Sequence, residues 1–158
     1  ELYTALQTGV IDATEWVGPY NDLAFGFQQI AKYYYFPGWH EPGSMLEFII
    51  NLDAWNELPT HLQSIVKTAA KAVNQDLLDE YTAMNNQALR ELIDVHNVQL
   101  KKLPDDVINE FRVISKSVLD EIAENDNQFK SIYESYLKFK SEVVSYHEIS
   151  EDAYTKIR

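Results

Sequence analysis

The chain has 158 residues, with 25 acidic and 13 basic side chains, no cysteine and a formal net charge of −12. A chain of this size can bury roughly 70% of the surface that it exposes when unfolded, which is enough for one ordinary core. The lack of cysteine excludes a disulfide scaffold, a thiol nucleophile and an iron–sulfur cluster. The strong negative charge argues against nucleic-acid binding, because phosphate contacts require clustered lysine and arginine.

Charge and residue type divide the chain near residue 60. Residues 1–60 carry eight acidic side chains, a single lysine and all five glycines, which is typical of short strands, turns and short helices. Residues 61–158 carry seventeen acidic and twelve basic side chains, with apolar residues at the spacing of long helices. The predicted fold class is therefore α/β, with short strands within residues 10–51 followed by long helices, and a cationic partner is expected near residues 1–60.

The first part of the chain contains several short predicted elements. Helices are expected before Gly9, over 23–31 and over 52–58. Strands are expected over 10–16, 33–36 and 45–51 from their aromatic and β-branched residues. The segment 37–43 contains two prolines and two glycines, so it is expected to be a loop.

The second part contains the predicted long helices. The first begins at Pro59, a residue suited to the first helical position, and its apolar spacing continues to residue 92 over about 50 Å. A short extended link is expected over 98–103. A further helix begins at Pro104, breaks near 124–127 and continues over 129–143.

Two carboxylates are the candidate ligand-binding groups. Glu15 ends the first predicted strand beside Trp16, and Glu41 lies in the loop after the second. A right-handed crossover places the ends of successive parallel strands at one edge of a sheet, where ligands bind. Converging carboxylates repel each other unless a cation or a shared proton lies between them. Their oxygens, with the Trp16 main-chain oxygen, suit Na⁺, Ca²⁺ or Mg²⁺.

Each candidate also has a purely structural interpretation. Glu15 can be a solvated strand end, Trp16 a core anchor and Glu41 part of a rigid surface turn. The sequence has no nucleophile elbow, no glycine-rich phosphate loop and no histidine spacing for a metal triad, so no catalytic residue and no enzyme activity are predicted. In a second interpretation, the long helices form an oligomerisation or interaction module and the carboxylates are solvated.

Three segments carry a resemblance to a known family. They are residues 2–16 (LYTALQTGVIDATEW), 31–35 (AKYYY) and 37–43 (PGWHEPG). These segments resemble the extracytoplasmic receptors of TRAP (tripartite ATP-independent periplasmic) transporters. Within that family they resemble the branch that binds 2-oxo or 2-hydroxy monocarboxylates such as pyruvate or lactate, and the C4-dicarboxylate branch is the alternative.

The resemblance implies the C-terminal portion of a two-lobed periplasmic binding protein whose signal peptide has been removed. It implies that Glu15, the Trp16 main-chain oxygen and Glu41 bind a metal cation, Na⁺ or Ca²⁺, together with the organic acid. Residues 1–60 would then belong to one lobe, and residues 61–158 would bridge the lobes or form a homodimer interface. The family's glutamine metal ligand and substrate-binding arginine would lie in an amino-terminal half outside this chain.

The resemblance also implies the partners. These are a small organic acid and the membrane subunits of the transporter, with a homodimer as a further expectation. The arginines agree with a half-site, because all three lie beyond residue 60 and none in residues 1–60 can bind the ligand carboxylate through two hydrogen bonds.

Overall fold

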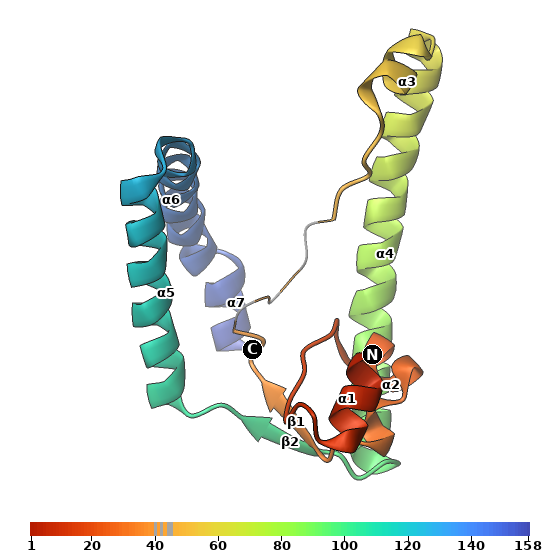
Figure 1. Ribbon diagram of the computed structural model, residues 1–158, viewed down its shortest axis with the longest axis vertical. Helices are drawn as coiled ribbons and strands as arrows, with labels where there is room; N and C mark the ends of the chain where they lie inside the picture. Colours follow the sequence, from red (N-terminus) through yellow and green to blue (C-terminus); the bar gives the residue numbers. More distant parts are fainter. Residues whose placement is uncertain (40, 42, 44–45) are drawn as a thin grey trace. The chain divides into compact units, whose positions relative to one another are not determined.

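A computed structural model of the protein describes residues 1–39, 41, 43 and 46–158. They form two compact units, Glu1–Leu103 and Pro104–Arg158. In chain order the elements are α1 (Leu2–Thr8), α2 (Pro19–Phe25), the 3₁₀ helix η1 (Phe27–Gln29), β1 (Tyr33–Phe36), α3 (Leu52–Glu57), α4 (Thr60–Asp94), β2 (Gln99–Lys102), α5 (Asp105–Asn125), α6 (Asn127–Ile149) and α7 (Glu151–Ile157) (Figure 1).

The first unit is built around the carboxyl-terminal part of α4, where Ala88 and Leu92 are buried. Helix α2 packs against this part of α4. The Tyr20 main-chain N–H donates to Asn85 Oδ1 at 2.9 Å, and the rings of Tyr20 and Tyr81 meet edge-on at 6.2 Å. Because of this packing α4 belongs to the same compact unit as residues 1–60, and this unit extends to Leu103.

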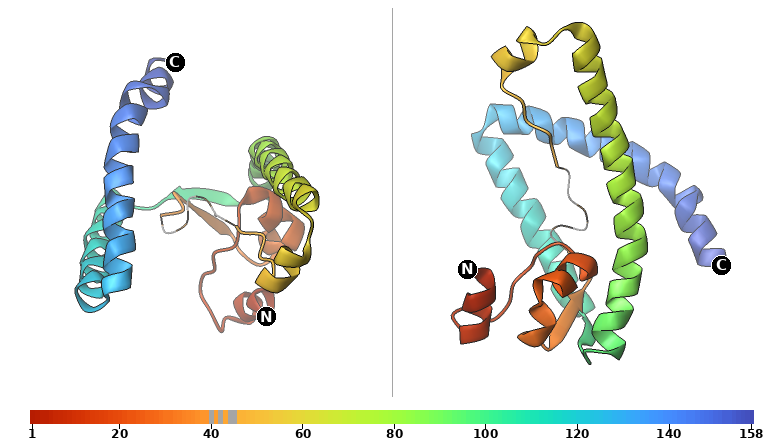
Figure 2. Two further views of the ribbon diagram at one scale, coloured as in Figure 1. Left: turned by 90° about the horizontal axis from the view of Figure 1, so that it is seen from above. Right: turned by 90° about the vertical axis from the view of Figure 1, so that its right-hand side faces the viewer.

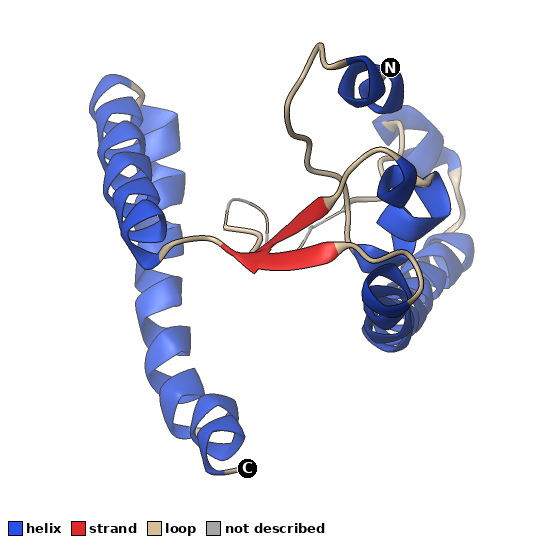
Figure 3. Ribbon diagram, turned by 90° about the horizontal axis from the view of Figure 1, so that it is seen from below, coloured by secondary structure: helices blue, strands red, loops and turns tan. Residues whose placement is uncertain are grey.

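Strands β1 and β2 form a parallel two-stranded sheet, with Tyr33 opposite Gln99 (Figure 3). Helices α3 and α4 make the long crossover that joins them, as a parallel pair requires. Tyr33 and Tyr35 are exposed, whereas Tyr34 between them is partly buried, as expected for successive side chains on opposite faces of a strand. The predicted strand 33–36 is confirmed, and the extended link expected over 98–103 contains a paired strand.

Two of the three expected strands are not strands in the described part of the chain. After α1, the N–H groups of Val10 and Ile11 donate back to the Ala5 carbonyl at 2.9 and 3.3 Å, and residues 10–16 pair with no strand. Residues 46–51 are irregular as well, whereas residue 45 lies outside the described residues. The predictions over 10–16 and 46–51 are wrong because β-propensity alone does not make a strand, which also needs a neighbour for its N–H and C=O groups.

Helix α2 begins and ends earlier than the helix expected over 23–31. It begins at Pro19, whose missing N–H and restricted φ suit the first helical position. It ends at Gly26, which has φ 87° and whose N–H donates to the carbonyls of Asp22 and Leu23. Glycine adopts this left-handed conformation at little cost, so the helix stops there and η1 follows.

The second unit consists of the three helices α5, α6 and α7 and the residues that join them. Helix α5 ends at a bend where α6 sets off in a different direction (Figure 2). The Asp126 side chain accepts hydrogen bonds from the N–H groups of Gln128 and Phe129 at 2.8 and 2.9 Å, and it thereby caps α6. The break expected near 124–127 is confirmed.

Both long helices of this unit keep apolar side chains exposed. On α5 these include Val113, Ile114, Val118 and Ile122, and on α6 they include Ile132, Leu137, Phe139 and Val143. Throughout the part of the chain that the structure describes, no helix has both the length and the apolar character that crossing a membrane requires.

Candidate functional site

Glu15 and Trp16 lie in the loop between α1 and α2. Glu15 is exposed, and Trp16 is 43% exposed. The Trp16 ring lies 5.4 Å from the ring of Phe25, which in turn contacts the rings of Tyr3 and Phe27 at 6.4 and 5.0 Å. This aromatic cluster anchors the indole against the first unit, while both residues of the loop keep exposed surface.

A buried carboxylate holds the main chain directly after Trp16. Asp22 is only 8% exposed, and its Oδ1 accepts the Val17 N–H at 3.4 Å while its Oδ2 accepts the Tyr34 hydroxyl at 2.6 Å. Burial, then the hydrogen bond to Asp22 and its charge, raises the pKa of Tyr34 well above its usual value, so the phenol keeps its proton. Asp22 therefore links the loop that carries Trp16 to strand β1.

A second contact places the start of α2 against α4. A Cβ atom at Gly18 would lie 3.2 Å from Asn85 Oδ1, the oxygen that accepts the Tyr20 N–H. This approach is tight for any larger residue, so glycine suits the position. Asn85 therefore contacts the start of α2, whereas Asp22 contacts the main chain of the loop itself, at Val17.

Glu41 follows the carboxyl end of β1 and is exposed. A Cβ atom at Gly38 would lie 3.5 Å from the main-chain oxygen of Glu41, which is ordinary van der Waals contact. Residues 40, 42, 44 and 45 lie outside the described residues. The joint binding of one cation by Glu15, Trp16 and Glu41 stays a prediction.

The donor atoms of these three residues fit a hard cation. Glu15 and Glu41 offer carboxylate oxygens, and within the described ranges no N–H or O–H group donates to the Trp16 main-chain oxygen. Calcium takes six to eight such oxygen ligands, so a complete site needs further ligands beyond these three residues. No group of three or more histidine, aspartate or glutamate side chains that could hold a metal occurs among the described residues, and the predicted set contains only two such side chains.

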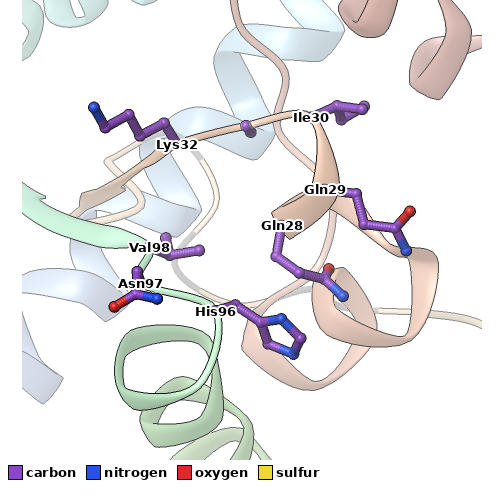
Figure 4. Close-up of a pocket in the computed structure, with 8 residues that line it drawn as sticks. Gln28, Gln29, Ile30, Lys32, His96, Asn97 and Val98 are labelled. Atoms are coloured by element: carbon purple, nitrogen blue, oxygen red, sulfur yellow. The ribbon is translucent and has the colours of Figure 1, made fainter.

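A shallow pocket of about 210 Å³ lies at the opposite end of the sheet (Figure 4). Its lining is formed by Gln28, Gln29, Ile30, Ala31, Lys32, His96, Asn97 and Val98. It is placed where both strands begin, because Lys32 and Val98 directly precede β1 and β2. Ligands of parallel sheets bind beyond the carboxyl ends of the strands, which is the end that leads to Glu41. The sequence did not point to this pocket, and it contains none of the predicted ligand residues.

The chain is similar to known bacterial solute-binding proteins. Residues 1–126 match DctP, the bacterial extracellular solute-binding protein family 7. A monocarboxylate 2-oxoacid-binding periplasmic protein of Nostoc sp. strain PCC 7120 is 38% identical over 154 residues, which cover 98% of this chain and 42% of that protein.

A solved structure from Bordetella bronchiseptica RB50 has the same fold. It is a TRAP transporter solute-binding protein with 33% identity and a TM-score of 0.91, and the match covers 99% of this chain and 46% of that one. That crystal structure is a mixed-occupancy dimer, with copurified calcium and picolinate in one active site and an apo site.

The chain spans less than half the length of both relatives. The family match extends over most of this chain and includes both the α/β segment and α5, so it does not rest on a single motif. The resemblance in residues 2–16, 31–35 and 37–43 is confirmed, and the α/β fold matches part of a periplasmic binding protein. The chain belongs to bacterial extracellular solute-binding protein family 7, the solute-binding receptors of TRAP transporters.

Proposed function

We propose that this chain is the carboxyl-terminal part of a periplasmic TRAP receptor that captures a small 2-oxo or 2-hydroxy monocarboxylate together with a metal cation. The observation that carries the proposal is 38% identity over nearly the whole chain to a protein that binds 2-oxoacids. The receptor performs no catalysis, and it delivers the bound acid to membrane subunits of the transporter. A C4-dicarboxylate is the alternative ligand.

The charge of the chain supports a cation in the site. Residues 1–60 hold eight acidic side chains and one lysine, so an organic anion that approaches them meets like charge. A bound cation reverses this repulsion, because it is the largest local charge in such a site. Glu15, the Trp16 main-chain oxygen and Glu41 would hold this ion, and an arginine and a glutamine outside this chain would complete the site. Calcium in the Bordetella structure favours Ca²⁺ over Na⁺.

The helices supply the remaining part of the proposal. The apolar side chains that α5 and α6 expose are available to bridge the two lobes or to pair with a second receptor. The dimeric Bordetella structure supports a homodimer. An independent helical interaction module is a weaker candidate, since the family match begins at residue 1 and covers the ligand-binding segment.

The test uses the intact receptor, meaning this chain within a polypeptide of the relatives' full length. Calorimetric titration with pyruvate and lactate, with and without Ca²⁺, is expected to show binding that depends on the metal. Glu41→Gln replaces a charged carboxylate ligand of the cation by a neutral amide. We expect it to weaken binding of the acid by more than about tenfold, because replacing residues that only hydrogen-bond to metal ligands already lowers metal affinity by about tenfold or more.

Glu47→Gln is the matched control, because Glu47 is an exposed glutamate outside the predicted set. It is expected to leave the affinity unchanged. Equal affinities of Glu41→Gln and the unmodified receptor would remove Glu41 from the site. Tighter binding of succinate or malate than of pyruvate or lactate would assign the C4-dicarboxylate alternative.

A further inference from the structure

The peptide unit between Trp16 and Val17 joins a predicted cation ligand, the Trp16 carbonyl oxygen, to an N–H that contacts Asp22. A peptide unit is planar and trans, so the Trp16 carbonyl and the Val17 N–H share one rigid plane and point in opposite directions. The Val17 N–H donates to Asp22 Oδ1 at 3.4 Å. A contact on the N–H side of this plane therefore also determines the direction of the carbonyl oxygen on the other side.

We propose that Asp22 is a positioning residue for the cation site, acting through this peptide. Its carboxylate orients the Trp16–Val17 unit so that the Trp16 carbonyl oxygen faces the cation. The inference rests on the proposed function, because it takes that oxygen as a cation ligand. Asp22 itself contacts neither the cation nor the organic acid.

Asp22 is held rigidly enough to act in this way. It is 8% exposed, and its main-chain N–H donates to the Gly18 carbonyl at 2.9 Å in the first turn of α2. The Tyr34 hydroxyl donates to its second oxygen at 2.6 Å. The two side-chain contacts use different oxygens, so the carboxylate cannot turn away from Val17 without losing the bond to Tyr34.

The contact also affects the electronic character of the peptide. At 3.4 Å it is longer than an ordinary N–H···O bond, and its acceptor is an ionised carboxylate. The negative charge of the acceptor adds a second effect, because an N–H bonded to an anion polarises its peptide and makes the carbonyl oxygen more negative. Both effects favour binding of a cation by the Trp16 oxygen.

The same carboxylate connects both parts of the proposed half-site. Tyr34 lies on β1, and the carboxyl end of that strand leads into the loop that carries Glu41. Val17 lies in the loop that carries Glu15 and Trp16. Asp22 is therefore bonded to both chain segments that supply the predicted ligands, and a change at this residue is expected to reach the cation site without removing a ligand.

The first measurement is the calcium affinity of the intact receptor. Asp22→Ala removes both contacts, and Asp22→Asn keeps the shape while removing the charge and one acceptor oxygen. We expect a roughly 10- to 100-fold loss of calcium affinity for Asp22→Ala, the range found when residues that orient metal ligands are replaced. Asp22→Asn is expected to lie between Asp22→Ala and the unmodified receptor.

The second measurement observes the peptide itself. Of the three tryptophans, only Trp16 is followed by valine in this chain. Labelling tryptophan at its carbonyl carbon with carbon-13 and valine with nitrogen-15 therefore selects this peptide among those of this chain by NMR. In the unmodified receptor its carbonyl resonance is expected to shift as calcium is added. In Asp22→Asn the resonance is expected to start at a different position and to shift only at higher calcium concentration.

Asn85→Ala is the control that separates the orientation of the Trp16–Val17 peptide from a general weakening of the packing of α2. It removes the acceptor of the Tyr20 N–H and weakens the packing of α2 on α4, but it leaves the Asp22–Val17 contact in place. We expect it to lower the melting temperature and to leave calcium affinity unchanged. An equal loss of calcium affinity in Asn85→Ala and in the Asp22 variants would show that only the fold of α2 matters, and would overturn the proposal.

The outcomes distinguish this inference from the proposed function. If the unmodified receptor binds no calcium, the proposed function fails. Equal calcium affinity after Glu41→Gln would remove Glu41 from the proposed site. If calcium binding depends on Glu41 but Asp22→Asn changes neither the affinity nor the carbonyl resonance, only the role of Asp22 fails. If Asp22→Ala does not fold, the calcium affinity and carbonyl resonance of Asp22→Asn alone test the role of Asp22.

Discussion

Partly buried Tyr34 and buried Asp22 form a hydrogen-bonded pair in the first unit. Their hydrogen bond of 2.6 Å connects β1 to α2, and burial together with Asp22 raises the pKa of Tyr34. A raised pKa means that the folded state holds this proton more tightly than the unfolded chain does. The resulting stabilisation is fully present below the unfolded pKa of tyrosine and is lost as the pH rises above it.

We therefore expect the free energy of unfolding of the intact receptor to fall above about pH 10, where tyrosine in the unfolded chain loses its proton. Tyr34→Phe removes the group and should make the decrease smaller. Urea denaturation on either side of this pH measures the effect. Tyr33→Phe is the control, because Tyr33 lies on the same strand and is 50% exposed, and a similar change there would contradict the role of Tyr34.

Local chemistry determines where several elements begin and end. Pro19 begins α2, Gly26 ends it with a left-handed φ, and Asp126 separates α5 from α6 by capping the second helix. These signals act through hydrogen bonds between near neighbours in the chain. They can be found in the sequence. The helix expected over 23–31 rests on apolar spacing across Gly26, where α2 ends, so glycine is the stronger signal at this position.

For α6 we expect Asp126→Ala to destabilise the protein by about 1 kcal/mol, because two N–H groups lose their acceptor at the first turn. Chemical denaturation of the intact receptor, followed by circular dichroism, measures the loss. Glu134→Ala, in the exposed middle of the same helix, should change stability by less than about 0.5 kcal/mol. A loss at Glu134 as large as that at Asp126 would argue against the cap.

The described residues of the chain bury little of their apolar surface. In its described part the buried apolar residues are Phe27, Ala88, Leu92 and Val98, all in the first unit, while α5 and α6 keep large apolar side chains exposed. Burial of such surface is the main force that stabilises a fold, so we expect further chain or a second subunit to cover these faces. Relatives more than twice as long as this chain, one of them dimeric, agree with that expectation.

For the intact receptor we expect calcium and a 2-oxoacid to stabilise the fold together. A ligand that binds only the native state raises the melting temperature, so the acid with calcium should give a larger increase than either alone. A thermal-shift screen of 2-oxo, 2-hydroxy and dicarboxylic acids, with calcium or with a chelator, measures this. Equal melting temperatures with and without the chelator would contradict a metal in the ligand site.

The family, the strand 33–36, the long helix and the helix break near residue 126 could all be recognised in the sequence, because they depend on motifs, spacing and capping between near neighbours. The strands expected over 10–16 and 45–51 could not be tested from the sequence alone, since strand pairing depends on which segment lies alongside. The division after residue 103 likewise depends on the packing of α2 on α4.

The candidate site shows the same distinction. Glu15, Trp16 and Glu41 can be chosen from the sequence by their residue types and their positions in motifs. Asp22 looks there like an ordinary acidic residue in a helix-start turn. Only the tertiary structure buries it between Val17 and Tyr34, which lie five and twelve residues away. The net charge of −12 follows from composition alone, whereas the role of each carboxylate depends on the neighbours that folding brings to it.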